Sequence, residues 1–403
     1  MPELLSPAGD LERLKIAFIY GADAVYIGGP ILGLRANAIN FTFEEIKEAV
    51  NFAHQRNKKI YVTVNIVLHN KEVKAVDDYL KTLEKLQVDA IIVSDIYIIK
   101  RALEITNLEV HLSTQASTMN KEMALFYKNL GVKRIVLARE ATKEDIKEII
   151  DNVDIEIECF IHGAMCSSIS GRCAMSNFLT GRDANRGGCA QTCRWDYNLE
   201  NKDGNMIQGE KNFTFCAKDL SMLRSLPEMI DMGIKSFKIE GRMRSIYYIA
   251  TIVGTYRKVI DRYLNNKENY KYDESLEQIL RNCANRDAVI QFFYGLKDEK
   301  CSYYNGREEV SNQDFLGIVL DYNNKTNIAT IEQRNYFKKG DTCIIFGPNH
   351  EEITYTFDDI RDEDNNIIEI VRHPRQIIQI KIKETLEKYD MLRIKKVDKT
   401  TNV

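Results

Sequence analysis

A strand, a helix and a second strand are expected within residues 3–27, which read ELLSPAGDLERLKIAFIYGADAVYI. The short apolar start is followed by Asp10, which can cap a helix, and apolar residues then recur at helical spacing as far as Gly21. The β-branched and aromatic run at 24–27 predicts the next strand. A strand, a crossover helix and a strand in this order form a parallel βαβ unit, so the stretch indicates an α/β fold.

The same alternation continues to about residue 264. Further strands are expected at 60–64, 90–93, 109–112, 134–137, 155–161, 213–216 and 236–239. Helical segments separate most of them, including one that begins with a capping box of Thr42 and Glu45 and two more at about 220–232 and 245–263. Eight or nine such strands predict a TIM-like β/α barrel, regular or irregular, over residues 1–264. An open doubly wound sheet is the alternative, although no Gly-x-Gly-x-x-Gly follows the first strand.

The composition and periodicity of the sequence change twice after the predicted barrel. Residues 265–314 are highly charged and are interpreted as a helical connector. Short alternating runs separated by turn residues then predict a small all-β barrel over 315–396, with strands at 317–320, 328–331, 343–346, 353–357, 367–371 and 376–382.

Composition limits the partners and the compartment. The 403 residues carry a formal net charge of only −3, so a nucleic acid must be bound by a local basic patch. The amino terminus lacks the pattern of a secretory signal, and no apolar run is long enough for a membrane helix. We therefore expect a cytoplasmic protein without a membrane partner, whose nine cysteines stay reduced. A cluster of them suggests metal or redox chemistry rather than disulfides.

The stretch 158–197 holds five of the nine cysteines, four arginines and the single tryptophan, without helical or strand periodicity past Ile161. Such a segment cannot stabilise itself by burying apolar surface, so we expect its thiols to bind an inorganic centre. The four candidate ligands have six, fifteen and three residues between neighbours: Cys166, Cys173, Cys189 and Cys193. Irregular spacing among glycines and serines favours an iron-sulfur cluster, while zinc and catalytic thiols stay open as alternatives. Cys216, at the end of another predicted strand, is a reserve ligand.

Charged residues follow the predicted strand 236–239, at the barrel end where TIM-barrel chemistry occurs. Lys238, Glu240 and Arg242 alternate and share one face of an extended chain, so they either line a polar mouth or form structural salt bridges. His162 has three interpretations: a base that activates Cys166, a donor that lines the site, or a buried structural histidine.

Arginines and aromatic residues surround the cysteines. Guanidinium groups beside aromatic faces bind phosphates and stacked bases, so the region predicts a local RNA-type surface. A small dicarboxylate, or the carbonyls of the loop itself, would suit the same arginines. The residues concerned are Arg172, Arg182, Arg186, Arg194, Trp195 and Tyr197.

These motifs closely resemble the signature of peptidase family U32, once called collagenase-like proteases. The similarity is carried by the sequences at 162–166, 170–173, 185–189 and 193–195, and by 4–9, 33–37 and 238–242 elsewhere. It extends to Asn335, Phe337, Gly340, Asp341, His373, Pro374, Asp390 and Met391 in the tail, and so covers essentially the whole chain.

The resemblance is strongest to the tRNA hydroxylation branch of this family. It implies an iron-sulfur protein, with a 4Fe-4S cluster on Cys166, Cys173, Cys189 and Cys193, that makes 5-hydroxyuridine at the wobble position of tRNA and depends on prephenate. Other relatives hydroxylate a ribosomal RNA cytidine or act as paired subunits in ubiquinone synthesis, so a paralogous subunit is a further expected partner.

We expect the site residues to divide by role. The catalytic group is His162, Lys238, Glu240 and Arg242; the cofactor-binding group is Arg35, Arg172, Asn185 and Arg186; the RNA-binding group is Arg194, Trp195 and Tyr197. Arg242 or Arg186 is the candidate for binding the carboxylates of a prephenate-like molecule.

Two other classes of function stay open. A peptidase is the first, although the sequence contains neither His-Glu-x-x-His nor Gly-x-Ser-x-Gly and offers only Cys166 with His162. A non-catalytic subunit that carries a cluster or zinc for a related partner is the second.

Overall fold

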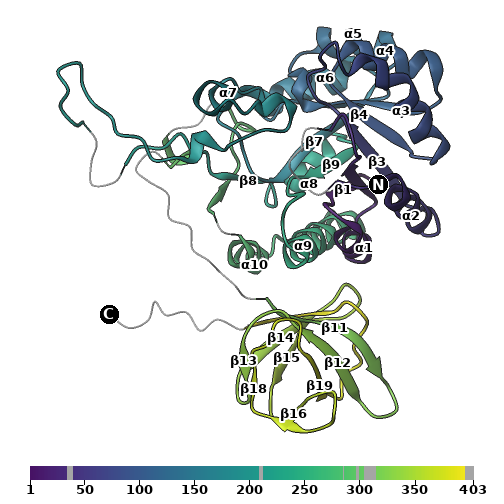
Figure 1. Ribbon diagram of the computed structural model, residues 1–403, viewed down its shortest axis with the longest axis vertical. Coiled ribbons are helices and arrows are strands. Elements are labelled where there is room, and N and C mark those ends of the chain that lie inside the picture. Colours follow the sequence, from purple (N-terminus) through teal and green to yellow (C-terminus); the bar gives the residue numbers. More distant parts are fainter. Residues whose placement is uncertain (34–39, 208–211, 285, 296–298, 304–314, 395–403) are drawn as a thin grey trace. The chain divides into compact units, whose positions relative to one another are not determined.

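The computed structural model describes residues 1–33, 40–207, 212–284, 286–295, 299–303 and 315–394 (Figure 1). The chain forms two compact units. The first comprises Met1–Arg281 with Arg286–Val310, and the second comprises Asn282–Asn285 with Ser311–Val403.

The first unit is a closed parallel barrel. Its strands follow one another around the ring as β1 (Glu3–Pro7), β2 (Ala24–Gly28), β3 (Lys59–Val64), β4 (Ala90–Val93), β5 (Glu109–Leu112), β6 (Arg134–Val136), β7 (Glu156–Gly163) and β9 (Ser236–Ile239). Strand β9 pairs in parallel with both β7 and β1 and so completes the ring. The TIM-like prediction is confirmed, and ring closure excludes the open doubly wound alternative.

Helices surround this ring on the outside (Figure 1). They are α1 (Leu11–Ile19), α2 (Phe43–His54), α3 (Val73–Lys85), α4 (Ile96–Ile105), α5 (Lys121–Leu130), α6 (Lys143–Asn152), α8 (Leu226–Asp231) and α9 (Ile246–Asn265). Asp10 accepts a hydrogen bond from the Arg13 N–H at the start of α1, and Thr42 and Glu45 form the predicted capping box of α2. No helix among the described residues is both long enough and apolar enough to cross a bilayer.

The chain between β7 and β9 differs from the prediction. Residues 213–216 form only an isolated bridge from Phe213 to Tyr197, not a strand. The strand in this region is β8 (Asp219–Ser221), which overlaps the start of the helix predicted at about 220–232, and α8 begins only at Leu226. Strand β8 forms because β7 continues to Gly163, where its free edge pairs with β8 in an antiparallel register.

The predicted helical connector is helical only in part. Helix α10 (Ser275–Cys283) lies within it, but β10 (Ala288–Val289) is a strand that pairs in parallel with β8. This pairing joins the connector to the edge of the barrel sheet. The prediction missed β10 because two residues show no strand periodicity by themselves.

The second unit is an antiparallel half-barrel, which confirms the predicted all-β domain. Eight strands form one sheet in the order β15 (Ile353–Thr356), β14 (Thr342–Phe346), β20 (Met391–Ile394), β11 (Phe315–Asn323), β12 (Ile328–Gln333), β19 (Ile377–Lys381), β16 (Ile360–Arg361) and β17 (Ile367–Ile368). A separate ribbon pairs β13 (Phe337–Lys338) with β18 (Ile370–Val371). One apolar core lies inside, where the rings of Phe337 and Phe357 stack with centroids 4.4 Å apart.

Candidate active site

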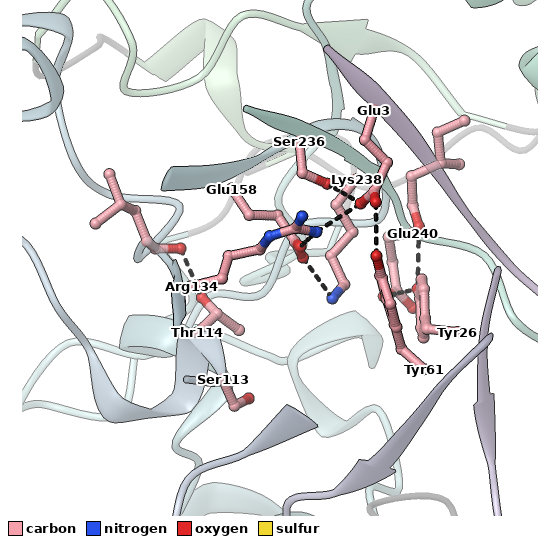
Figure 2. Close-up of polar contacts among 12 residues, drawn as sticks. Glu3, Tyr26, Tyr61, Ser113, Thr114, Arg134, Glu158, Ser236, Lys238 and Glu240 are labelled. Carbon is pink, nitrogen blue, oxygen red and sulfur yellow. Dashed lines mark hydrogen bonds and ion pairs between the residues drawn. The ribbon is translucent and has the colours of Figure 1, made fainter. Parts of the chain in front are cut away.

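Charged side chains pair with one another inside the barrel (Figure 2), beside a buried apolar cluster that includes Leu5 and Ile92. The Lys238 Nζ lies 2.8 Å from a carboxylate oxygen of the fully buried Glu158, and Arg134 contacts the other oxygen at 3.4 Å. Arg134 also contacts Glu3 at 2.6 Å, and the Tyr61 hydroxyl donates to the same carboxylate at 2.6 Å. These charges compensate one another inside the ring.

Electrostatics maintain this pairing. Burial by itself would raise the pKa of Glu158, but Lys238 and Arg134 outweigh it and hold the pKa below its ordinary value. Glu158 therefore stays ionised and keeps Lys238 as its partner. The structure favours the salt-bridge interpretation of Lys238 over a catalytic one.

Glu240 directly follows β9 and lies beyond Lys238, toward the carboxyl end of the barrel strands. The Tyr26 hydroxyl is 3.0 Å from the Ile239 carbonyl and 3.3 Å from a Glu240 carboxylate oxygen. Arg139 approaches the same carboxylate at 3.6 Å, stacks on the Phe160 ring at 3.9 Å, and donates to the Ala164 carbonyl at 2.8 Å. Arg139 thus connects the mouth of the barrel to the chain that leads into the cysteines.

Arg242 is also buried, and it contacts the end of β2 and the chain that follows β2. Its Nη2 donates to the Asn40 side chain at 2.8 Å, and its guanidinium packs over Gly28, where a Cβ atom would collide with it. Arg35, the other predicted ligand on this side, lies outside the described residues.

Side-chain hydrogen bonds hold the cysteine-rich segment in place of an apolar core. Asn185 donates to the Cys173 carbonyl at 3.1 Å and accepts from the Cys173 N–H at 3.2 Å. The Ser170 N–H donates to the Glu140 carboxylate at 2.9 Å, which attaches the turn at Ser170 to the loop after β6. The longest regular element of the cysteine-rich segment past β7 is the short helix α7 (Met175–Thr180). Asn185 therefore positions a predicted ligand.

All nine cysteines are free thiols, and five of them form one electrostatically connected group: Cys166, Cys173, Cys189, Cys193 and Cys216. Cys166 lies within electrostatic range of Cys173 and Cys193, and Cys193 within range of Cys189 and Cys216. Burial raises the pKa of both Cys166 and Cys193, while a hydrogen bond from the Ser168 N–H partly offsets the shift at Cys166. The described residues contain no three His, Cys, Asp or Glu side chains placed to hold one metal ion.

Arg186 is engaged in an ion pair. It contacts Glu72 at 2.7 Å and donates to the Val67 carbonyl at 2.6 Å, which attaches the cysteine-rich segment to the chain after β3. A hydrogen bond from Arg186 lowers the pKa of Glu72 to about 2. The structure thus gives Arg186 a scaffolding contact in place of the predicted ligand-binding one, whereas Arg172 is exposed.

Aromatic side chains flank the last cysteine. Trp195 is 45% exposed, and the Tyr197 hydroxyl donates to the Thr192 carbonyl at 2.7 Å. Tyr197 packs edge-on against Phe215, which is 43% exposed and also packs against Phe213. Phe215 extends the predicted base-stacking surface, and the sequence analysis missed it by placing it in a strand.

Two family profiles match the chain. That of peptidase family U32 matches residues 9–302, and that of the U32 C-terminal domain matches residues 311–393. This chain belongs to peptidase family U32. The predicted family is therefore confirmed.

Relatives of this U32 protein have different names. It is 49% identical to tRNA hydroxylation protein P1 of Bacillus subtilis, over 97% of this chain and 94% of that one. It is 42% identical to the 23S rRNA 5-hydroxycytidine C2501 synthase of Escherichia coli, over 66% of this chain and 40% of that one. A protein named collagenase from Porphyromonas gingivalis is 30% identical over 97% of both chains.

His162 in this U32 protein lies against helix α9. Its Nδ1 is 3.3 Å from the Tyr256 hydroxyl, and its ring packs on Tyr256 and Tyr248. Burial, with a contribution from Arg244, lowers the pKa of His162 to about 3. So weak a base is poorly suited to deprotonate Cys166, and the structural interpretation of His162 fits the geometry best.

The sequence analysis missed a group of charged residues near Cys193 and Cys216. Asp219, at the start of β8, is buried and lies 2.9 Å from Arg286 and 3.5 Å from Arg244. Burial raises the pKa of Asp219, and the surrounding arginines oppose this shift. No local pattern could reveal the group, because its members are far apart in the sequence.

Proposed function

We propose that this protein hydroxylates RNA, and that its substrate is the wobble uridine of tRNA, which it converts to 5-hydroxyuridine. The observation that carries the proposal is the gathering of five thiols beside the mouth of a closed barrel, to which Arg139 connects them. The names of the relatives from Bacillus subtilis and Escherichia coli support the same class of reaction.

The proposed cofactor is an iron-sulfur cluster on Cys166, Cys173, Cys189 and Cys193, with Cys216 as the alternative to one of them. The irregular spacing of these cysteines among glycines and serines supports a cluster, whose sulfurs accept hydrogen bonds from N–H donors, over a single zinc ion. When bound, the cluster would supply one-electron redox chemistry at this end of the barrel.

The residues of this chain would position the RNA. Trp195 and Phe215 offer exposed rings on which a flipped base can stack, and exposed Arg172 and Arg182 can contact phosphates. Glu240, beside Tyr26 and Arg139, provides a carboxylate that can accept a hydrogen bond from the imide of uracil. The hydroxyl source would be a small carboxylate such as prephenate.

Complementation tests the function. A strain that lacks this protein would receive the wild type, Cys166→Ala, or Cys343→Ala as the matched control, since Cys343 is buried in the second unit. We expect the wild type and the control to restore 5-hydroxyuridine in bulk tRNA, measured by mass spectrometry, and Cys166→Ala to restore none. If the wild type restores no hydroxylated nucleoside in any RNA, the proposal is wrong.

Cofactor content is measured separately. Anaerobically purified wild-type protein is expected to contain iron and sulfide and to lose both with Cys166→Ala. A colourless, zinc-loaded wild-type protein would contradict the cluster.

A further inference from the structure

A short ribbon of the second unit, formed by β13 and β18, exposes one of its faces (Figure 1). Phe337 lies opposite Val371 in this ribbon, and both side chains are fully buried in the core of the half-barrel. The next pair, Lys338 opposite Ile370, therefore points away from the core, and both of its side chains are exposed. Lys338 thus presents its charge on the outer face.

An aromatic ring and two guanidinium groups adjoin this face. Tyr336 precedes β13 and Arg372 follows β18, so the antiparallel pairing places both at the same end of the ribbon. Tyr336 is 52% exposed, and Arg372 and Arg375 are exposed as well. We call Tyr336, Lys338, Arg372 and Arg375 the basic ribbon.

The turn that carries the two arginines is held in place by Gln376. Its side-chain oxygen accepts hydrogen bonds from the N–H groups of Arg372 and His373, each at 3.3 Å, and its own N–H donates to the His373 carbonyl at 3.0 Å. The Gln376 carbonyl accepts from the Gln333 N–H at 2.9 Å, which attaches the turn to the end of β12. A backbone fixed in this way has little freedom left to lose when its side chains bind a partner.

The cations of the basic ribbon have no counter-charge within the protein. Lys338, Arg372 and Arg375 form no ion pair with any residue that the structure describes. The exposed acid of the ribbon, Glu369, lies at its other end, where its carbonyl accepts from the Lys339 N–H at 2.8 Å. By contrast, three arginines elsewhere in the same unit each contact a carboxylate at 2.6 to 3.1 Å: Arg334, Arg361 and Arg393.

The charge of the rest of the unit makes this concentration local. Residues 315–394 contain fourteen aspartates and glutamates but only eleven lysines and arginines. A polyanion would be repelled by most of such a surface, so its contact is expected where unpaired cations lie together.

The aromatic ring among these cations decides between two kinds of polyanion. Guanidinium groups bind phosphates through paired hydrogen bonds, and an exposed aromatic ring stacks on an unpaired base. An acidic polypeptide would neutralise the same cations, but its carboxylates offer no planar base to Tyr336. RNA therefore matches both features of the basic ribbon.

We infer that the basic ribbon binds the phosphate backbone of RNA, with Tyr336 stacked on an unpaired nucleotide. This inference rests on the proposed function and deepens it. It gives the second unit an RNA contact of its own, in addition to Trp195 and Phe215 of the first unit.

Fluorescence anisotropy of the full-length protein with a labelled, unmodified tRNA transcript tests the inference. The double variant Lys338→Gln with Arg372→Gln should bind about tenfold more weakly at about 0.1 M salt. The slope of log affinity against log salt should become smaller by about 1 to 2, because two phosphate contacts are lost. Tyr336→Leu should bind about fivefold more weakly with an unchanged slope, because stacking carries no charge.

Lys325→Gln with Lys383→Gln is the matched control, since it removes the same charge from two exposed lysines of the same unit. These lysines lie near the ends of β12 and β19 where Ile328 pairs with Lys381, whereas the basic ribbon adjoins the opposite ends of these strands. The control should bind the transcript as the wild type does, and circular dichroism verifies that each variant is folded.

Poly-glutamate serves as the second probe and should bind more weakly than the transcript. No binding of the transcript by the wild type, equal affinity of the Lys338→Gln, Arg372→Gln variant and the control, or poly-glutamate bound as tightly as the transcript would each overturn the assignment. Binding is measured without hydroxylation, so these results test the ribbon alone, and complementation tests the proposed function separately.

Discussion

At the scale of single residues, charge pairing inside the barrel explains why polar side chains can fill a core. Glu158 is fully buried, yet Lys238 and Arg134 keep it ionised. Removing one partner of such a pair leaves an uncompensated charge in a medium that solvates it poorly.

Glu158→Gln should therefore destabilise the barrel unit. We expect a loss of about 3 to 5 kcal/mol in the free energy of unfolding, because Lys238 and Arg134 lose their shared counter-charge. Urea unfolding followed by Trp195 fluorescence measures the change. Glu148→Gln removes the partner of Lys121 on the surface and should change stability little. Similar effects for the two variants would refute the structural role of Glu158.

A second residue-scale prediction concerns His350 in the half-barrel. Its Nε2 lies 2.9 Å from Asp390 and its Nδ1 lies 2.8 Å from the Glu351 carbonyl, so the protonated ring can donate to both. Burial alone would lower the pKa of His350, but these hydrogen bonds and the charges of Asp390 and Glu387 raise it above the ordinary value of about 6.5.

The sign of the pH dependence follows from this shift. Because the folded-state pKa is raised, the stability that His350 contributes is fully present below about pH 6.5 and is lost as pH rises through the folded-state pKa. Nuclear magnetic resonance titration of the histidine rings should give His350 a pKa above the ordinary value of about 6.5, and Asp390→Asn should lower it. A His350 pKa below about 6.5 would contradict the pairing.

At the scale of elements, the turns that carry the cysteines depend on side chains rather than on periodic backbone bonding. The Asn185 side chain forms two hydrogen bonds with the backbone of Cys173, which lies twelve residues earlier in the chain. The amide of Asn185 is thus a cross-link within an irregular segment.

Asn185→Ala should loosen the turn around Cys173 without unfolding the barrel. We expect faster hydrogen exchange across 172–175 and a lower iron content after purification, because a less ordered ligand binds a cluster less tightly. Asn198→Ala, an exposed change in the same region, is the matched control. Unchanged exchange and iron content in Asn185→Ala would show that other contacts position Cys173.

At the scale of the whole molecule, each of the two units has its own core. Units with separate cores can unfold separately. The only tryptophan, Trp195, reports on the barrel unit alone, whereas far-ultraviolet circular dichroism reports on both. We expect the two urea-unfolding curves not to coincide, and a single shared transition would show that the units unfold together.

The sequence predicts those features that neighbouring residues encode, and it does not predict those that depend on contacts between distant residues. The ring of parallel strands was predictable because its βα periodicity repeats along the chain, and the family signature marked the cysteines. Strand β8 was not predictable, since it exists only through pairing with the free end of β7 and with β10. The ion pair of Arg186 with Glu72 and the contacts of Asp219 join distant residues, which no spacing rule can reveal.

The placement of the cysteine-rich segment has a wider consequence. It lies between β7 and β9, neighbouring strands of the closed ring, and a crossover between parallel strands needs only a dozen or so residues. Most of residues 164–235 are thus surplus to closing the ring. The length and the surface residues of this segment can change while the barrel strands keep their register. A U32 protein can therefore acquire a new substrate without a change in its barrel.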